Sequence, residues 1–198
     1  MKDYRTHWAR RLTTSVASAL ARTVWRLKVR GLENVPREGP LIVASNHVSL
    51  CDGPMLAVAL GLDRPVCFLT KEELFRVPVF GWYLSAVGNI PVDRSRGDVS
   101  ALRAAVERVR AGGCLGMFPE GTRVKGRARG AVKAGVGFLA RETGARVVPA
   151  RLVNTDRFPA PHRVEVRFGE AMTFRGDPGD RAACRAFAEE LMERVRRL

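Results

Sequence analysis

The hydrophobic pattern of the first thirty residues changes its period once. Bulky apolar side chains recur every fourth residue within Lys2–Val24, which predicts an amphipathic helix whose apolar stripe is Leu12, Val16, Leu20 and Val24. In that helix Arg10, Arg11 and Arg22 project away from the stripe. From Trp25 the apolar residues alternate with Arg and Lys, which predicts a strand over 25–30.

Short apolar runs and amphipathic segments then alternate along the rest of the chain. The expected strands are 41–45, 65–69, 87–92, 114–118, 147–153 and 164–168. The expected helices are 52–60, 72–86 broken by Pro78 and Gly81, 99–111, 131–143 and a last one opened by Asp177-Pro178. In the helix over 99–111 we expect Val99, Leu102, Val106 and Val109 to share one face, with Asp98 as its cap.

This alternation predicts an α/β fold with a mixed, largely parallel sheet flanked by helices on both faces. We expect one domain over 1–198, in which residues 1–24 form the amphipathic helix and 25–198 the catalytic core. Pro149 lies inside an apolar run and predicts an edge or bulged strand. Ligands of such sheets bind beyond the carboxyl ends of the strands.

Charge and cysteine content narrow the possible partners and the compartment. The net charge of +14 favours anionic partners, namely nucleic acid, anionic lipid headgroups or phosphorylated metabolites. The four cysteines have no C-x-x-C spacing, which indicates reduced core residues. No apolar run is long enough to span a bilayer, and arginines interrupt any signal-peptide core, so we expect a cytoplasmic protein with at most peripheral membrane contact.

The first candidate site is the segment NHVSLCD, where His47 follows a strand and Asp52 begins a helix. A carboxylate bound to one imidazole nitrogen fixes the tautomer and leaves the other nitrogen free to accept a proton. No protein nucleophile stands beside this pair, which points to a substrate hydroxyl as the nucleophile. The alternative interpretation is a turn histidine followed by Asp52 as a helix cap.

Three further segments are candidates for the site, and two of them place polar side chains after a predicted strand. FPEGTR places Glu120, Thr122 and Arg123 after a strand in a tight turn suited to holding an anion, although it could equally be an ordinary polar loop. GNIPVDR delivers Asp93 and Arg94 to a strand end, either for phosphate recognition or as a surface ion pair. VVPARLV could line an apolar cleft or be a core strand.

In this order, the four segments resemble the four blocks of the glycerolipid acyltransferase family, whose best-known members are the 1-acylglycerol-3-phosphate acyltransferases. The resemblance extends from about Val29 to Phe168, and its most specific parts are His-x4-Asp and FPEGTR. Pro91 departs from the second block, where many members carry a bulky apolar residue. The resemblance implies a glycerol-3-phosphate acyltransferase-like fold.

It also implies a reaction, in which His47 is the general base, Asp52 orients it, and a glycerol hydroxyl attacks acyl-CoA or acyl-carrier protein. The residues implied to bind the acceptor are Arg94, Lys71, Arg123, Glu120, Gly121 and Thr122, and Asn46 is a candidate oxyanion donor. No metal or other cofactor is expected, since a thioester is already activated and His7 and His162 lack ligand spacing.

The partners implied are a lysophospholipid, the acyl donor and an anionic membrane surface at the inner face of the cell membrane, contacted by the first helix and by 74–82. Packing against the domain is the alternative for both segments. Glycerol 3-phosphate or another lyso-lipid, such as a lyso-ornithine lipid, is an alternative acceptor. A nucleic-acid-binding protein is disfavoured by dispersed arginines and few aromatics, and a catalytically inactive lipid-binding module is disfavoured by the His47–Asp52 pair.

Overall fold

A single seven-stranded sheet organises the protein, with the strands in the order β1-β7-β6-β2-β5-β3-β4. The computed structural model describes residues 8–93, 98–123, 130–176 and 180–198. The strands are β1 (Lys28–Arg30), β2 (Leu41–Ser45), β3 (Val66–Lys71), β4 (Ile90–Val92), β5 (Cys114–Met117), β6 (Arg146–Val153) and β7 (Glu165–Phe168).

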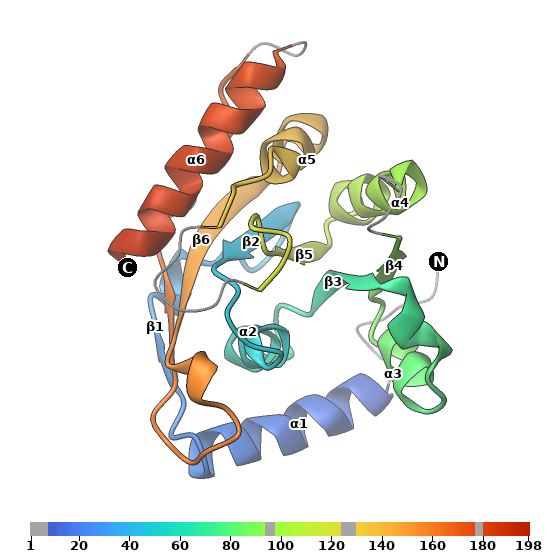
Figure 1. The fold of residues 1–198 in the computed structure, drawn as a ribbon, viewed down its shortest axis with the longest axis vertical. Coiled ribbons are helices and arrows are strands. Elements are labelled where there is room, and N and C mark those ends of the chain that lie inside the picture. The colour runs from blue at the N-terminus through green and yellow to red at the C-terminus, as the bar shows by residue number, and fades with distance from the viewer. Residues whose placement is uncertain (1–7, 94–97, 124–129, 177–179) are drawn as a thin grey trace.

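Helices cover both faces of this sheet (Figure 1). The α-helices are α1 (Trp8–Thr23), α2 (Asp52–Leu60), α3 (Phe80–Ala86), α4 (Val99–Arg110), α5 (Gly135–Thr143) and α6 (Arg181–Arg197). Three short 3-10 helices are η1 (Leu32–Asn34), η2 (Glu72–Arg76) and η3 (Thr155–Arg157). Helix α2 packs on one face with α1 outside it, while α4, α5 and α6 pack on the other.

The strand directions confirm the mixed, largely parallel sheet. Strands β6, β2, β5, β3 and β4 are parallel neighbours, β7 runs antiparallel to β6, and β1 is parallel to β7. All five residues of β2 are buried, because this central strand is covered on both faces. Its carboxyl end, where His47 follows, therefore lies at the middle of the sheet edge.

Of the two interpretations of VVPARLV, the core strand is confirmed and the edge or bulge at Pro149 is wrong, because β6 lies inside the sheet between β7 and β2. Pro149 pairs with Ala44 of β2 and accepts a hydrogen bond from the Gly169 N–H on its other side, just past the end of β7. The N–H and C=O of one residue point to the same side of a strand. The N–H that proline lacks would therefore face the end of β7, so its absence interrupts no hydrogen bond to β2.

Helix α4 confirms its predicted cap and most of its predicted apolar face. The Asp98 carboxylate accepts from the Ala101 N–H, as expected of a cap, and Gly112 follows the helix at a φ of 81°. The residues buried on the helix are Ala101, Ala105 and Val109, whereas Val99 is 59% exposed. Leu102 and Val106 pack against the same core as Val109, so these three residues of the predicted stripe face the core, while Val99 in the first turn does not.

The four cysteines are all buried and free, which confirms the interpretation of them as reduced core residues. Helix α6 buries Phe187, Leu191 and Val195 as expected, and its cap is Asp180, while Asp177 and Pro178 lie outside the described residues.

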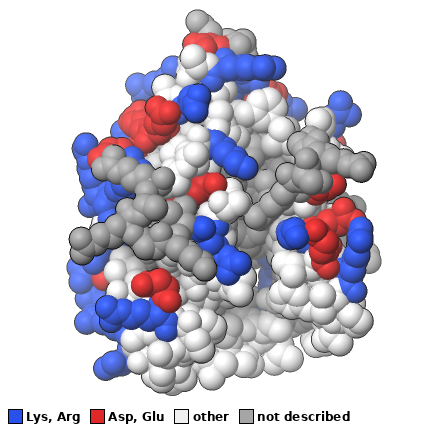
Figure 2. All heavy atoms as spheres, viewed as in Figure 1, with Lys and Arg blue, Asp and Glu red and all other residues white. Residues whose placement is uncertain are grey.

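Helix α1 turns its bulky apolar stripe to the outside. Leu12, Val16 and Leu20 are 57%, 52% and 48% exposed, while the opposite side, with Ala21 and Arg10, is buried. Arg10 therefore points inward instead of projecting into solvent. Small residues on the inner side allow α1 to approach α2 closely. The lower margin of the molecule, where Figure 1 shows α1 and α3, carries almost no charge in Figure 2. None of the described helices is both long and apolar enough to cross a bilayer.

Candidate active site

The loop between β2 and α2 holds His47 and Asp52 in direct contact. The Nδ1 atom of His47 lies 2.8 Å from Oδ2 of Asp52. The side chain of His47 is 15% exposed and that of Asp52 is completely buried. One ring nitrogen is thus bound to the carboxylate, which leaves Nε2 as the atom available for proton transfer.

The same carboxylate oxygen also shapes the loop. Oδ2 of Asp52 accepts from the backbone N–H groups of Val48 and Ser49, at 2.7 and 2.8 Å. These donors precede Asp52, whereas a capping side chain accepts from N–H groups that follow it, and the residue at the cap position is Cys51. Asp52 is therefore not a helix cap, and it holds the loop and the imidazole together.

Asn46 fixes the loop to the neighbouring strand β6. Its Nδ2 donates to the Leu152 carbonyl at 3.0 Å, and its Oδ1 accepts from the Leu152 N–H at 2.9 Å. The side chain thereby extends the pairing of β2 with β6 by one residue beyond Ser45. The residue named as an oxyanion donor from the sequence thus has both ends of its amide bound to backbone, with one amide hydrogen left over.

The FPEGTR segment meets the histidine loop from strand β5. Oε2 of Glu120 accepts from the backbone N–H of His47 at 2.8 Å. The turn is closed by the Gly121 N–H donating to the Phe118 carbonyl at 2.8 Å, and Gly121 has a φ of 71°, which favours glycine. Thr122 and Arg123 are exposed. Glu120 and His47 are 73 residues apart in sequence, so the fold brings these two predicted site residues together.

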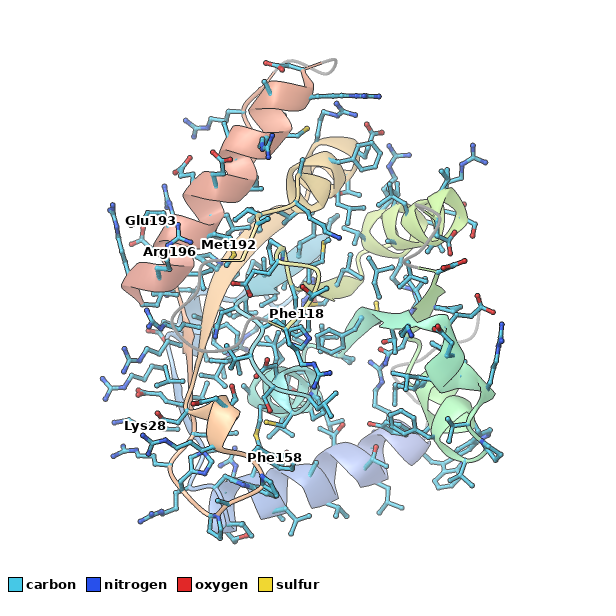
Figure 3. The ribbon with its side chains drawn as sticks, in the orientation of Figure 1. Lys28, Phe118, Phe158, Met192, Glu193 and Arg196 are labelled. Atoms are coloured by element: carbon cyan, nitrogen blue, oxygen red, sulfur yellow. The ribbon has the colours of Figure 1, made fainter. Side chains whose placement is uncertain are left out.

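Phe118 covers one face of the His47 ring. The ring centroids are 4.1 Å apart with an angle of 17° between the planes. Phe68 of β3 lies nearly parallel to Phe118, at 6.0 Å and 7°. Figure 3 shows Phe118 near the centre of the molecule, between the sheet and α2.

The residues expected to hold a phosphate fall only partly within the described residues. Lys71 ends β3 with 54% of its side chain exposed, and its Nζ lies 2.8 Å from Oε1 of Glu73. Arg94 lies outside the described residues. Its neighbour Asp93 follows β4, and the Asp93 N–H donates to the Asp98 carboxylate at 3.1 Å.

Two groups near the site have displaced pKa values. Hydrogen bonds from Ser100 and from the backbone of Ala101 and Asp93 lower the pKa of Asp98 to about 2. Burial raises the pKa of the Cys51 thiol, which therefore stays neutral beside Asp52. Among the described residues, no group of three His, Cys, Asp or Glu side chains is placed to hold a metal ion.

Comparison with known proteins assigns this site to a family. The acyltransferase family model matches residues 26–153, which include every segment described above. The chain belongs to the acyltransferase family. The resemblance seen in the four sequence blocks is thereby confirmed.

Relatives of this acyltransferase are named as 1-acyl-sn-glycerol-3-phosphate acyltransferases. It is 33% identical over 166 residues to the 1-acyl-sn-glycerol-3-phosphate acyltransferase of Pseudomonas aeruginosa, covering 79% of this chain and 63% of that protein. It is 34% identical over 136 residues to the chloroplastic 1-acyl-sn-glycerol-3-phosphate acyltransferase LPAT1 of Arabidopsis thaliana, covering 67% of this chain and 37% of that one. The chain thus spans between about two fifths and two thirds of the length of these relatives.

A solved structure shares the fold. The 1-acyl-sn-glycerophosphate acyltransferase of Thermotoga maritima superimposes with a TM-score of 0.74 at 27% identity, covering all of this chain and 83% of that one. The α/β architecture predicted from the sequence is confirmed by this likeness.

Sequence reasoning missed the side chains that support the acyltransferase site from β3. Phe68 carries the outer ring of the aromatic pair, and its N–H is held by Oδ1 of Asn89 at 2.9 Å. Glycine at 116, inside a buried strand, was the available signal, since such a glycine often marks the close approach of another group.

Proposed function

We propose that this acyltransferase moves a fatty acyl group from acyl-CoA or acyl-carrier protein to the sn-2 hydroxyl of 1-acylglycerol 3-phosphate, giving phosphatidate. The observation that carries the proposal is the 2.8 Å contact between His47 Nδ1 and a fully buried Asp52, with the ring itself partly exposed. The names of the relatives support the choice of 1-acylglycerol 3-phosphate as the acceptor.

In the proposed reaction Asp52 keeps the hydrogen on Nδ1 of His47, so that Nε2 accepts the proton of the acceptor hydroxyl. The hydroxyl oxygen attacks the thioester carbonyl, and a tetrahedral oxyanion forms. Collapse breaks the C–S bond, and the proton on Nε2 passes to the departing thiolate. Base catalysis of this kind contributes about 10²–10⁴-fold to the rate.

Cations at the carboxyl edge of the sheet would bind the acceptor phosphate. We assign this role to Arg94, with Lys71 and Arg123, because guanidinium and ammonium groups suit phosphate oxygens. Gly121 and Thr122 would form the wall of the acceptor site. The remaining amide hydrogen of Asn46 is the donor that the oxyanion hypothesis requires.

We further propose that the apolar lower margin docks on an anionic membrane. Its exposed apolar side chains come from α1, from the start of α3 and from the residue before it, and they include Leu12, Val16, Val79 and Trp82 at 57%, 52%, 80% and 53% exposure. Trp8 and Trp82 pack together at 6.1 Å and join the two segments. Exposed Arg11, Arg22 and Arg26 add attraction to anionic headgroups. The location would then be peripheral, on the inner face of the cell membrane.

The decisive experiment offers labelled acyl-CoA to the purified protein with a panel of acceptors. We expect labelled phosphatidate from 1-acylglycerol 3-phosphate, and its loss in His47→Ala with the circular dichroism spectrum unchanged. Wild-type turnover in His47→Ala would refute the base assignment. Turnover restricted to glycerol 3-phosphate would refute the acceptor while retaining the chemistry.

A second acceptor belongs in the panel for a specific reason. The chain is also 31% identical over 126 residues to the lyso-ornithine lipid O-acyltransferase of Pseudomonas aeruginosa, covering 63% of this chain and 47% of that protein. A lyso-ornithine lipid lacks the phosphate, so Arg94→Ala should impair acylation of lysophosphatidate more than acylation of this lipid.

A further inference from the structure

The His47–Asp52 contact alone does not fix the plane of the imidazole. One hydrogen bond joins Nδ1 to Oδ2, and the ring can still rock about its Cβ–Cγ bond while Nδ1 stays within reach of the carboxylate. Such rotation would swing Nε2 away from the acceptor hydroxyl. A second constraint is needed on the face of the ring.

Phe118 supplies that constraint. Its ring lies 4.1 Å from the His47 ring and is tilted by only 17°, so rotation of the imidazole would drive its edge into the phenyl face. Phe118 follows directly after the end of β5 at Met117, in a turn closed by its own carbonyl and the Gly121 N–H. The backbone that carries this ring is therefore fixed at both sides.

Phe68 backs Phe118 from the neighbouring strand. The two phenyl planes are within 7° of parallel, with their centroids 6.0 Å apart. Phe68 fits there because β5 has glycine at 116, where a Cβ would lie 2.2 Å from Cε1 of the Phe68 ring. Hence a glycine in β5 admits the ring from β3, which in turn keeps Phe118 flat against the histidine.

We propose that Phe118 is a positioning residue for the general base, and that Phe68 acts as its support through the space left by Gly116. The inference rests on the proposed acyl transfer by His47. The rings act through the imidazole and need no contact with either substrate. Their effect should therefore appear in the rate of the chemical step and leave substrate affinity nearly unchanged.

The first test compares Phe118→Leu, which keeps apolar bulk but removes the flat face, with Phe118→Tyr, which keeps the ring. We expect Phe118→Leu to lower kcat by about 10- to 100-fold with both KM values within about twofold, because small misplacements of a catalytic group have effects of that size. Phe118→Tyr should restore most of the rate. A wild-type kcat in Phe118→Leu, or a raised KM at constant kcat, would overturn the proposal.

Phe174→Leu is the matched control. Phe174 forms an edge-to-face pair with Phe187 at 5.6 Å in the helix layer on the opposite face of the sheet, so the same chemical change is made away from the site. Its kcat should equal that of the wild type. A fall comparable to that of Phe118→Leu would mean that general loosening, not ring position, lowers the rate. If Phe118→Leu does not fold, Phe68→Leu provides a milder loss of support, for which a smaller fall in kcat is expected.

A spectroscopic arm separates this inference from the proposed function. The chain has three histidines, so the Cε1–H signal of His47 can be assigned with a His47→Gln variant. In the wild type this signal should be shifted upfield by the Phe118 ring current, and it should move downfield in Phe118→Leu but not in Phe174→Leu. An unmoved signal refutes the stack whatever the substrate. A moved signal in a protein that acylates no acceptor would refute the proposed function alone.

Discussion

At the scale of single residues, two carboxylates hold His47, one at its ring and one at its backbone. Asp52 binds the ring at Nδ1 and the backbone N–H of the next residue, while Glu120 binds the backbone N–H of His47 itself. The family resemblance assigned Glu120 to the acceptor site. Its contact with the His47 loop gives it a second task, which substitution can separate from the first.

We expect Glu120→Gln to retain much more activity than Glu120→Ala. The glutamine carbonyl can still accept from the His47 N–H, whereas alanine leaves that donor without its partner. Initial rates with lysophosphatidate and acyl-CoA provide the measurement. Equal losses in the two variants would show that the negative charge of Glu120, rather than its support of the loop, is used by the reaction.

Some of these contacts could be predicted from the sequence and others could not. The pair at 47 and 52 could be predicted because both residues lie in one short turn between a strand and a helix. The contact of Asn46 with Leu152 spans 106 residues, and the stack on Phe118 depends on which strands are neighbours. Neither is encoded by local spacing, so neither could be predicted before the strand order was known.

At the scale of elements, the site depends on how the end of each strand is joined to a neighbouring element. Asn46 joins the end of β2 to β6, and Asp98 joins the end of β4 to α4. Periodicity located nearly all of these strands and helices. It left Pro149 open between an edge or bulged strand and a core strand, because the tolerance of a proline depends on where the neighbouring strand β7 ends, which no pattern within β6 reveals.

Asn46→Ala should destabilise the fold as well as the site. Both hydrogen bonds to Leu152 are lost, and each contributes about 0.5–1.5 kcal/mol, so we expect the free energy of unfolding to fall by about 1–3 kcal/mol. Urea denaturation followed by circular dichroism measures it. A loss of activity with unchanged stability would instead indicate that the oxyanion role outweighs the structural one.

The lowered pKa of Asp98 predicts a pH-dependent difference between the wild type and Asp98→Asn. Its ordinary pKa of 3.8 falls to about 2 in the folded protein, so its ionised form stabilises the fold above pH 4, and this contribution is lost as pH falls through about 2. The wild type should have the higher Tm at neutral pH. The gap in Tm should be constant between pH 7 and about pH 5 and should narrow below about pH 4. If the difference in Tm did not depend on pH, the ionisation of Asp98 would not explain it.

At the scale of the whole molecule, chemistry and apolar surface occupy separate regions. His47, the proposed base, follows the carboxyl end of the central strand, and the exposed stripe of α1 lies outside α2 on one face of the sheet. The sequence predicted this stripe but could not decide whether it packs inward. Ala17 and Ala21 lie on the opposite side of α1 and pack in the core, so the bulky stripe faces outward.

Trp82→Ser should weaken binding to anionic vesicles, while Val99→Ser should not. Both residues are more than half exposed, at 53% and 59%, but Val99 begins α4, away from the proposed docking surface. Cosedimentation with vesicles containing phosphatidylglycerol measures the difference. We expect about a tenfold loss for Trp82→Ser, which corresponds to burial of roughly half of a large apolar side chain. Equal binding by both variants would exclude this face.

Because the four thiols are buried, their alkylation can report transient local unfolding. Burial raises the pKa of Cys114 to about 12, so in the native state this thiol is neither ionised nor accessible to an alkylating reagent. Iodoacetamide should therefore modify it only when the strand that carries it separates from its neighbours. The labelling rate of Cys114, followed by mass spectrometry, would then measure how often β5, the strand that leads to Phe118 and Glu120, opens.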